Sequence, residues 1–177
     1  MSVLVESNIE FDFAKAYRII EYENLMTGLP GASATQRNTF WPGIDFHIED
    51  APGDVIWLEV KSWNPTSIAP KYRGGSRRSF QCKMKSKTYA KEVREKFLGV
   101  SAFFLWDNRP VPLKVRFLLL FEPPHPLDSA LVLTFGQRVR SQLRPPSIIT
   151  WRSRIEVDAL TLTEWNLRFP DYPARII

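Results

Sequence analysis

Three side chains that suit metal-ion or acid–base chemistry stand close together in one short stretch of the sequence. Asp45 lies in a run where apolar and polar residues alternate, and Glu59 and Lys61 lie in a second such run after Pro52 and Gly53. Alternation with period two indicates strands, and Pro followed by Gly indicates a turn, so the two runs predict an antiparallel hairpin. A hairpin centred on Pro52 places Asp45 opposite Glu59, with Lys61 on the same face.

This arrangement predicts a site for a divalent cation. Two opposed carboxylates, whose Cβ atoms are about 5 Å apart in such a pair, repel each other unless a cation lies between them. Mg²⁺ binds through one or two carboxylates together with water and phosphate oxygens. The ammonium group of Lys61 could then orient a water molecule or offset the charge of a phosphate. The alternative interpretation is that Glu59 and Lys61 alternate on the solvent face of an ordinary antiparallel strand.

The rest of the chain offers little competing chemistry. Cys82 is the only cysteine, which excludes an intramolecular disulfide and a cysteine-based zinc site, and His47 and His125 are the only histidines. The sequence has no G-x-S-x-G, Walker or G-x-G-x-x-G motif, which disfavours serine hydrolases and nucleotide-binding enzymes. His47 falls on the predicted face of Asp45 and is interpreted as a residue at the rim of the site.

The net charge of +5 conceals two oppositely charged segments. Residues 1–60 contain ten acidic and three basic side chains, whereas residues 71–96 contain ten basic and two acidic ones. A basic segment of this density is typical of proteins that bind the nucleic-acid backbone, and a solvated loop is the alternative. The predicted nucleic-acid-binding residues are Lys71, Arg73, Arg77, Arg78, Lys83, Lys85 and Lys87. Later arginines, Arg138, Arg140, Arg144, Arg152 and Arg154, form either a second phosphate-contacting patch or a solvated face.

The remaining elements follow from periodicity, caps and breakers. Ser7 and Glu10 form an S-x-x-E capping box that predicts a first helix over 7–26. After the hairpin we expect a polar loop over 64–83, a basic helix over 84–98 ended by Gly99, and a buried strand over 100–106. Further on we expect a strand over 114–121, a helix over 128–143, an extended segment over 148–162 and a helical turn over 163–169.

Length and composition predict one soluble domain of the α/β or α+β class. The chain has 177 residues, of which 44% are hydrophobic, enough for a substantial core. The longest nearly uncharged apolar runs, at 97–106 and 115–121, are shorter than the roughly 20 residues that span a bilayer. No secretory signal is visible at the start. We therefore expect a cytoplasmic protein without a membrane partner.

The hairpin residues resemble a known superfamily of nucleases. PGID at 42–45 and LEVKS at 58–62 are similar to the two halves of the PD-(D/E)xK signature of restriction-endonuclease-like enzymes. The resemblance covers about residues 7–106. It implies an α/β fold with a central mixed sheet flanked by helices, with a core over about 7–122 and a C-terminal elaboration over about 123–177.

The resemblance also implies roles for individual residues. Asp45 and Glu59 would hold Mg²⁺, with Mn²⁺ as a substitute, helped by the backbone carbonyl of Val60, and Lys61 would position or activate the attacking water. The family often adds an acid from the first helix, for which Glu10 is the first candidate and Glu6 the alternative. Some subfamilies place a Gln or Lys after the lysine, for which the candidates are Gln81, Lys83 and Lys85.

The function that the resemblance implies is Mg²⁺-dependent DNA endonuclease activity, hydrolysing phosphodiester bonds. The alternative is a noncatalytic nucleic-acid-binding module that keeps the nuclease fold. DNA is the expected partner, with RNA, a second copy of the chain or another protein left open.

Overall fold

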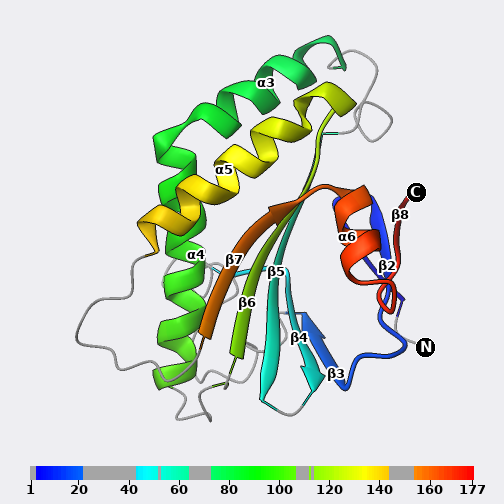
Figure 1. Cartoon of the computed structure of the whole chain (residues 1–177), viewed down its shortest axis with the longest axis vertical. Helices are drawn as coiled ribbons and strands as arrows, with labels where there is room; N and C mark the ends of the chain where they lie inside the picture. Colours follow the sequence, from blue (N-terminus) through cyan, green and yellow to red (C-terminus); the bar gives the residue numbers. More distant parts are fainter. Residues whose placement is uncertain are drawn as a thin grey trace, which may run out of the picture.

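The computed structural model describes residues 3–21, 43–51, 53–63, 73–106, 112, 114–143 and 154–177. Its centre is a five-stranded mixed sheet with strand order β3-β4-β5-β6-β7 (Figure 1). The strands are β3 (Arg18–Glu21), β4 (Phe46–Ala51), β5 (Asp54–Ser62), β6 (Lys114–Glu122) and β7 (Arg154–Leu160). The first three pair antiparallel, and β5, β6 and β7 pair parallel. The described chain is therefore a mixed α/β protein, as the sequence predicts.

Helices cover one face of this sheet. They are α3 (Arg73–Lys85), α4 (Lys87–Trp106) and α5 (Ser129–Gln142), preceded by a short 3₁₀ helix, η4 (Pro126–Asp128). Figure 1 shows all three α-helices on the same side of the strands. Their apolar side chains pack with Trp57 of β5 and Phe117 of β6 into one buried cluster. At Gly136 of α5 a Cβ atom would lie 2.8 Å from the Cβ of Ala159, so glycine allows the helix to approach β7 closely.

A second layer covers the opposite face. It consists of a small sheet, with strand order β1-β2-β8, and the short helix α6 (Leu162–Arg168). Its strands are β1 (Val3–Glu6), β2 (Ile9–Asp12) and β8 (Ala174–Ile176). Phe11 and Trp165 of this layer are fully buried with Ile56 and Leu118 of the central sheet. Because β5 and β6 are buried on both faces, they read as nearly continuous apolar runs.

The predicted hairpin is confirmed, including its register. Phe46 pairs with Leu58, His47 with Trp57 and Ile48 with Ile56. An irregularity between Glu49 and Ala51 shifts the pairing by one residue next to the turn. The shift lies at the end of the hairpin away from Asp45, so the pairing that positions the acidic residues is unaffected.

The predicted first helix is wrong. Residues 7–21 form a turn and two strands, and residues 22–26 lie outside the described residues. Ser7 and Asn8 have φ values of 53° and 61°, as expected for the two-residue turn of a hairpin that joins β1 and β2. Ile9, Phe11 and Phe13 are all buried, which reveals period two. The helical interpretation used Ile9 and Phe13 but not the equally buried Phe11 between them.

The elements between the hairpin and β6 also differ from expectation. Of the predicted loop over 64–83, residues 64–72 lie outside the described residues, and 73–83 belong to α3. Helix α4 continues through Gly99 to Trp106, so the predicted strand over 100–106 is wrong. Val100 and Phe103 are buried three residues apart, which is helical spacing. A short apolar run fits a buried strand and a buried helix equally, and packing on the sheet decides between them.

The elements of the C-terminal third agree with the sequence. Strand β6, helix α5 after Asp128 and helix α6 lie within a few residues of their predicted bounds, and β7 lies inside the extended segment predicted over 148–162, of which 148–153 are outside the described residues. The described residues after 122 are integrated with those before it, because β7 extends the central sheet and β8 pairs with β2. None of the described helices is both long enough and apolar enough to cross a membrane.

Candidate active site

Asp45, Glu59 and Lys61 converge at one end of the hairpin. The Lys61 Nζ atom lies 3.3 Å from Oε1 of Glu59 and 3.8 Å from Oδ2 of Asp45. The backbone N–H of Asp45 donates to the carbonyl of Leu58 at 3.0 Å, which ties Asp45 to β5 beside the last registered pair, Phe46 with Leu58. The Glu59 side chain is only 1% exposed. We call Asp45 and Glu59 the acidic pair.

Asp45 lies in surroundings that disfavour its negative charge. Burial and the nearby Glu59 carboxylate raise the pKa of Asp45 from 3.8 to about 6. The N–H of Val60 donates to Oδ2 of Asp45 at 2.6 Å, and this hydrogen bond offsets part of that cost. A carboxylate held in place while its charge is disfavoured is a good receptor for a cation.

Lys61 remains an ammonium group. Burial lowers its pKa, but the carboxylates of Glu59 and Asp45 act in the opposite direction and outweigh burial, so the net shift is upward. Lys61 is therefore protonated at neutral pH and can donate hydrogen bonds to a water molecule or a phosphate oxygen. In this state it is not a base.

A second lysine, which the sequence analysis counted only as part of the net charge, completes the cluster. Lys96 of α4 places its Nζ atom 2.6 and 2.7 Å from the two carboxylate oxygens of Glu59. Its position could have been inferred from the helical pattern, because Lys96 lies three residues after buried Val93 and four before buried Val100. A basic residue on the apolar face of a helix needs an acidic partner, and only the fold shows that the partner is Glu59.

The two candidate acids from the predicted first helix, Glu10 and Glu6, lie instead on the strands of the hairpin β1–β2. Glu10 lies on β2, where its carboxylate accepts from Nε of Arg175 at 2.7 Å. No contact between Glu10 and the acidic pair is found in the described residues. Glu6 is closer to the site, since it contributes to the raised pKa of Lys61. Ser7, which hydrogen-bonds to Glu6, also donates to the carbonyl of Val60 at 3.3 Å.

The donor set fits a divalent cation that also binds water and phosphate. The N–H of Val60 points at Asp45, and neighbouring N–H and C=O groups of one strand residue point to the same side, so the carbonyl of Val60 lies on the Asp45 side of β5. Two carboxylates and one carbonyl match the incomplete protein shell that Mg²⁺ accepts. Within the described part of the chain, no group of three or more His, Cys, Asp or Glu side chains is arranged to hold a metal by itself.

The basic residues divide into two groups. Arg77 donates through Nε to Oδ2 of buried Asp128 at 2.9 Å, and this ion pair joins α3 to the start of α5. Arg78, Lys83, Lys85 and Lys87 are exposed on α3 and the start of α4. Lys71 lies outside the described residues, and so does the side chain of Arg73.

The other candidates from the basic region have structural partners. Gln81 donates to Asp128 at 3.0 Å instead of approaching the acidic pair. Arg138 donates to the carbonyl of Met84 at 2.8 Å, and Arg140 donates to the carbonyl of Val157 at 2.6 Å. Arg138 therefore connects α5 to α3, and Arg140 connects α5 to β7 of the central sheet. The side chains of Arg144, Arg152 and Arg154 lie outside the described part.

Tyr89 links the basic surface to the acidic pair. The Nζ atom of Lys83 lies 4.7 Å from the centre of the Tyr89 ring. Burial raises the pKa of Tyr89, and the negative charges of Glu59, Glu92 and Asp45 raise it further. Tyr89 and Lys96 are seven residues apart on α4, which places them on one face of the helix.

The aromatic residues of the hairpin belong to the core. His47 is buried, accepts a hydrogen bond from Nε1 of Trp57 at 3.1 Å and stacks on Phe104, so its predicted place at the rim of the site is wrong. Trp57 is fully buried, and Trp63 packs against Phe80 of α3. The two tryptophans therefore support the helical layer.

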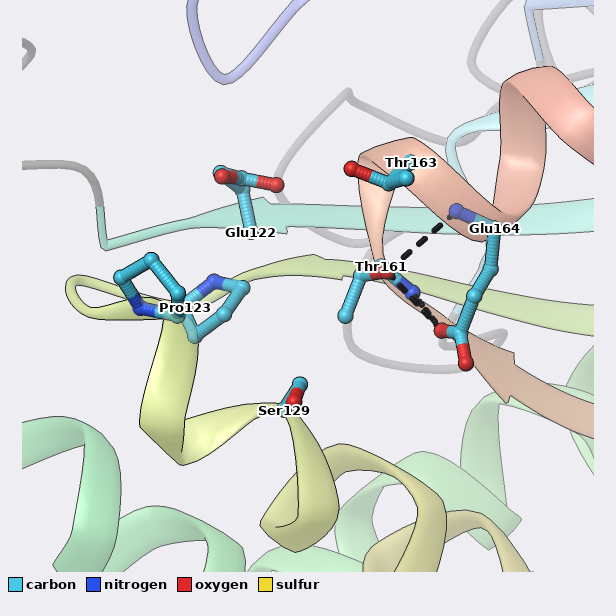
Figure 2. Close-up of a pocket in the computed structure, with 7 residues that line it drawn as sticks. Glu122, Pro123, Ser129, Thr161, Thr163 and Glu164 are labelled. Carbon is cyan, nitrogen blue, oxygen red and sulfur yellow. Dashed lines mark hydrogen bonds between the residues drawn. The ribbon is translucent and has the colours of Figure 1, made fainter.

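A separate pocket of about 350 Å³ lies where β6, α5 and α6 meet. Figure 2 shows Glu122 and Pro123 at the end of β6, Ser129 at the start of α5, and Thr161 and Glu164 at the start of α6. Thr161 and Glu164 are joined in a capping box, and Glu122 accepts from the N–H of Leu162 at 3.3 Å. Burial raises the pKa of Glu122. Successive side chains of β6 point to opposite faces of the sheet, so Glu122 points away from the face that carries Phe121. The pocket is therefore distinct from the acidic pair.

Comparison of the chain with protein-family models, with curated proteins and with solved structures found no match.

Proposed function

We propose that the chain is a Mg²⁺-dependent endonuclease that hydrolyses DNA phosphodiester bonds. The observation that carries the proposal is the convergence of Asp45, Glu59 and Lys61 on one end of the hairpin, with Glu59 buried and with surroundings that disfavour the charge of Asp45. Such a pair is more useful to a protein that binds a cation than to one that only binds DNA, since carboxylates repel phosphates.

The strand order supports the resemblance to restriction-endonuclease-like proteins. The antiparallel strands β3, β4 and β5 are followed by a helical crossover to the parallel strand β6. Of the first motif half, the described residues 43–45 directly precede β4, and the second motif half lies along β5. The helix expected before the hairpin is not found within residues 7–21, which form the turn and strands described above.

Hydrolysis of a phosphodiester bond requires a positioned water molecule, stabilisation of the charge on the phosphate oxygens, and a DNA backbone held in place. A water molecule attacks the phosphorus and gives up a proton to solvent; a new P–O bond forms as the opposite P–O bond breaks, and the leaving sugar oxygen takes up a proton from solvent. A cation held by Asp45, Glu59 and the Val60 carbonyl would supply electrostatic stabilisation of the charge that develops on phosphate oxygens. Lys61, as an ammonium, donates hydrogen bonds that orient the water or a phosphate oxygen. The exposed lysines and Arg78 on α3 and α4 would hold the DNA backbone nearby.

A noncatalytic nucleic-acid-binding module is the second candidate. The observation that favours it is the pairing of Glu59 with two ammonium groups, those of Lys61 and Lys96, which satisfies the carboxylate without a metal. In this reading the cluster stabilises the fold and the basic surface performs the function.

Nicking of supercoiled plasmid separates the two candidates. We expect conversion to open-circle and linear DNA with Mg²⁺ or Mn²⁺, none with a chelator, and none with Glu59→Gln. Glu10→Gln is the matched control, because Glu10 is also a strand carboxylate paired with a basic residue but lies away from the acidic pair. Salt-sensitive DNA binding by the wild type, with no cleavage of any DNA in either metal, would instead support the binding module.

A further inference from the structure

The single negative charge of Glu59 is paired with two ammonium groups, those of Lys61 and Lys96. Lys96 contacts both of its carboxylate oxygens, and Lys61 lies 3.3 Å from one of them. The two lysines come from different layers, α4 and β5. A buried carboxylate is costly without a partner, and these two ammonium groups are its partners in the absence of metal.

The charges of the cluster balance before any ligand arrives. Asp45 and Glu59 contribute two negative charges, and Lys61 and Lys96 contribute two positive ones. A divalent cation added to this set would leave an excess of two positive charges in a mostly buried place. Anions must accompany the cation, and the DNA backbone provides them.

Lys96 also lies where a cation would bind to Glu59. Its Nζ atom engages both oxygens, so a metal that takes Glu59 as a ligand competes for the same lone pairs. The Lys96 side chain is 29% exposed, and its flexible four-carbon stem allows the ammonium group to leave Glu59 without moving α4. Tyr89 lies on the same face of α4 as Lys96, and its ring centre is 4.7 Å from Nζ of exposed Lys83.

We propose that Lys96 is a positioning residue that Glu59 exchanges for the metal ion. In the metal-free state Lys96 holds the Glu59 carboxylate in place. When the cation binds, the released ammonium group turns to a DNA phosphate, so that metal binding and DNA binding strengthen each other. This inference rests on the proposed function, and it adds a coupling between the two ligands that the acidic pair alone does not require.

If the ion pair between Lys96 and Glu59 were purely structural, replacing Lys96 by a neutral residue would change the metal affinity in the opposite direction. Removing a structural partner of a buried carboxylate loosens the site, and metal affinity falls. Removing a competing cation raises metal affinity, because the metal no longer displaces an ammonium group. The direction of the change in affinity therefore distinguishes the two roles.

The test compares Lys96→Gln with the wild-type full chain. Gln keeps a hydrogen-bond donor for Glu59 but carries no charge. Electron paramagnetic resonance of Mn²⁺ gives the affinity without DNA, and we expect at least about tenfold tighter binding in the variant, on the usual strength of close charge–charge contacts. Lys96→Arg should restore the wild-type affinity. Lys91→Gln is the matched control, since Lys91 lies on the same helix and pairs only with exposed Glu95 at 3.6 Å in the described contacts.

The second measurement is the coupling itself. DNA affinity is determined with and without Ca²⁺, which avoids cleavage, and the ratio of the two affinities is the coupling factor. We expect this factor to fall at least about threefold in Lys96→Gln, because the ammonium group released by the metal is missing. Lys96→Met, which keeps most of the apolar stem, is measured in parallel so that a folded neutral variant reports the sign.

Two outcomes overturn the inference, and they differ. If the wild type binds Mn²⁺ through Glu59 but the neutral variants bind it no more tightly, Lys96 is a structural partner and the proposed function stands. If no Mn²⁺ binding that depends on Glu59 is found in any folded variant, the proposed function fails and the inference fails with it.

Discussion

Two clusters of buried acids and basic partners show how the same ingredients reach opposite electrostatic states. Asp128 is buried at the start of α5 and receives Arg77 and Gln81 from α3. Burial acts to raise the pKa of Asp128, but the hydrogen bonds from Gln81 and Arg77 outweigh it and the net shift is downward. In the acidic pair, Asp45 has Glu59 as a neighbour, and its pKa rises to about 6.

The opposite pKa shifts distinguish a cluster that stabilises the fold, that of Asp128, from a candidate binding site, that of Asp45. A carboxylate with a lowered pKa is more stable as an anion in the folded chain than outside it, so Asp128 contributes to holding α3 against α5. A carboxylate with a raised pKa is held by the fold at a cost, which is common where a ligand completes the set. The following experiments test this contrast.

The largest expected effect is on catalysis. Lys61→Ala should lower single-turnover cleavage of plasmid DNA on the order of 10²-fold or more, the scale of losing a positioned electrostatic group. DNA affinity measured in Ca²⁺ should stay within a few-fold, because one cation among many contributes little to backbone binding. Equal losses of cleavage and of affinity would make Lys61 a DNA-binding residue only.

The second effect is on folding, at the other cluster. Asp128→Asn should lower the free energy of unfolding by about 2 kcal/mol, because buried Asp128 loses its ion pair with the half-exposed Arg77 and its charged hydrogen bond with Gln81. The lowered pKa means that the contribution of Asp128 is present above its ordinary value of 3.8 and is lost as the pH falls through the still lower folded-state value. Urea denaturation at pH 7 and at pH 3 measures both. A variant as stable as the wild type at pH 7 would show that Asp128 does not stabilise the packing of α3 against α5.

The third effect concerns the two groups of basic residues. Replacing Arg78, Lys83, Lys85 and Lys87 together by Ala should weaken DNA binding about tenfold at low salt and flatten the dependence of affinity on salt, since fewer counterions are released. Arg77→Ala should leave the salt dependence nearly unchanged and act on stability instead, because its guanidinium is paired with Asp128. Filter binding over a salt series checks both, and an equal slope for the fourfold variant and the wild type would contradict the DNA-binding role.

The smallest effect has the opposite sign to that of Asp128. Without metal, Asp45→Asn should raise the free energy of unfolding by about 1 kcal/mol at pH 7, because the charged carboxylate that is disfavoured there is removed. Since the folded-state pKa is raised, the stability linked to Asp45 is present below pH 3.8 and is lost as the pH rises through about 6. The advantage of the variant should therefore grow between pH 4 and pH 7. Chemical denaturation across that range, in a chelator, provides the measurement.

Mg²⁺ should reverse the order of stability of the wild type and Asp45→Asn. If the acidic pair binds the cation, the wild type gains stability by mass action and Asp45→Asn does not. Melting temperatures with Mg²⁺ and with a chelator, for both proteins, complete the comparison. An identical shift in the two proteins would place the cation elsewhere.

Local sequence was sufficient to predict the hairpin and the convergence of its three chemical residues. Strict alternation, the turn at Pro52 and Gly53, and the two-residue period of side chains leave few registers that bury Ile48, Ile56 and Leu58 together. A shift by one residue would move Ile56 and Leu58 to the opposite face of the sheet, away from the cluster that they share with Phe11, so the hydrophobic pattern fixes the face of Glu59 and Lys61. Helices α5 and α6 were also predicted from local sequence and were found, although Asp128 makes no side-chain capping hydrogen bond to α5 and the cap of α6 at Thr161 was not predicted.

Tertiary packing decided what local sequence left ambiguous. The run from Phe97 to Trp106 is long enough for a strand or for three turns of helix, and only the sheet beneath it selects the helix. The segment 7–21 resembled a helix until pairing of β2 with β8 and of β3 with β4 gave its backbone groups other partners. Lys96 and Glu59 are 37 residues apart, and Arg77 and Asp128 are 51 apart. No periodicity connects such distant residues, because ion pairs between elements depend on how the helices dock on the sheet.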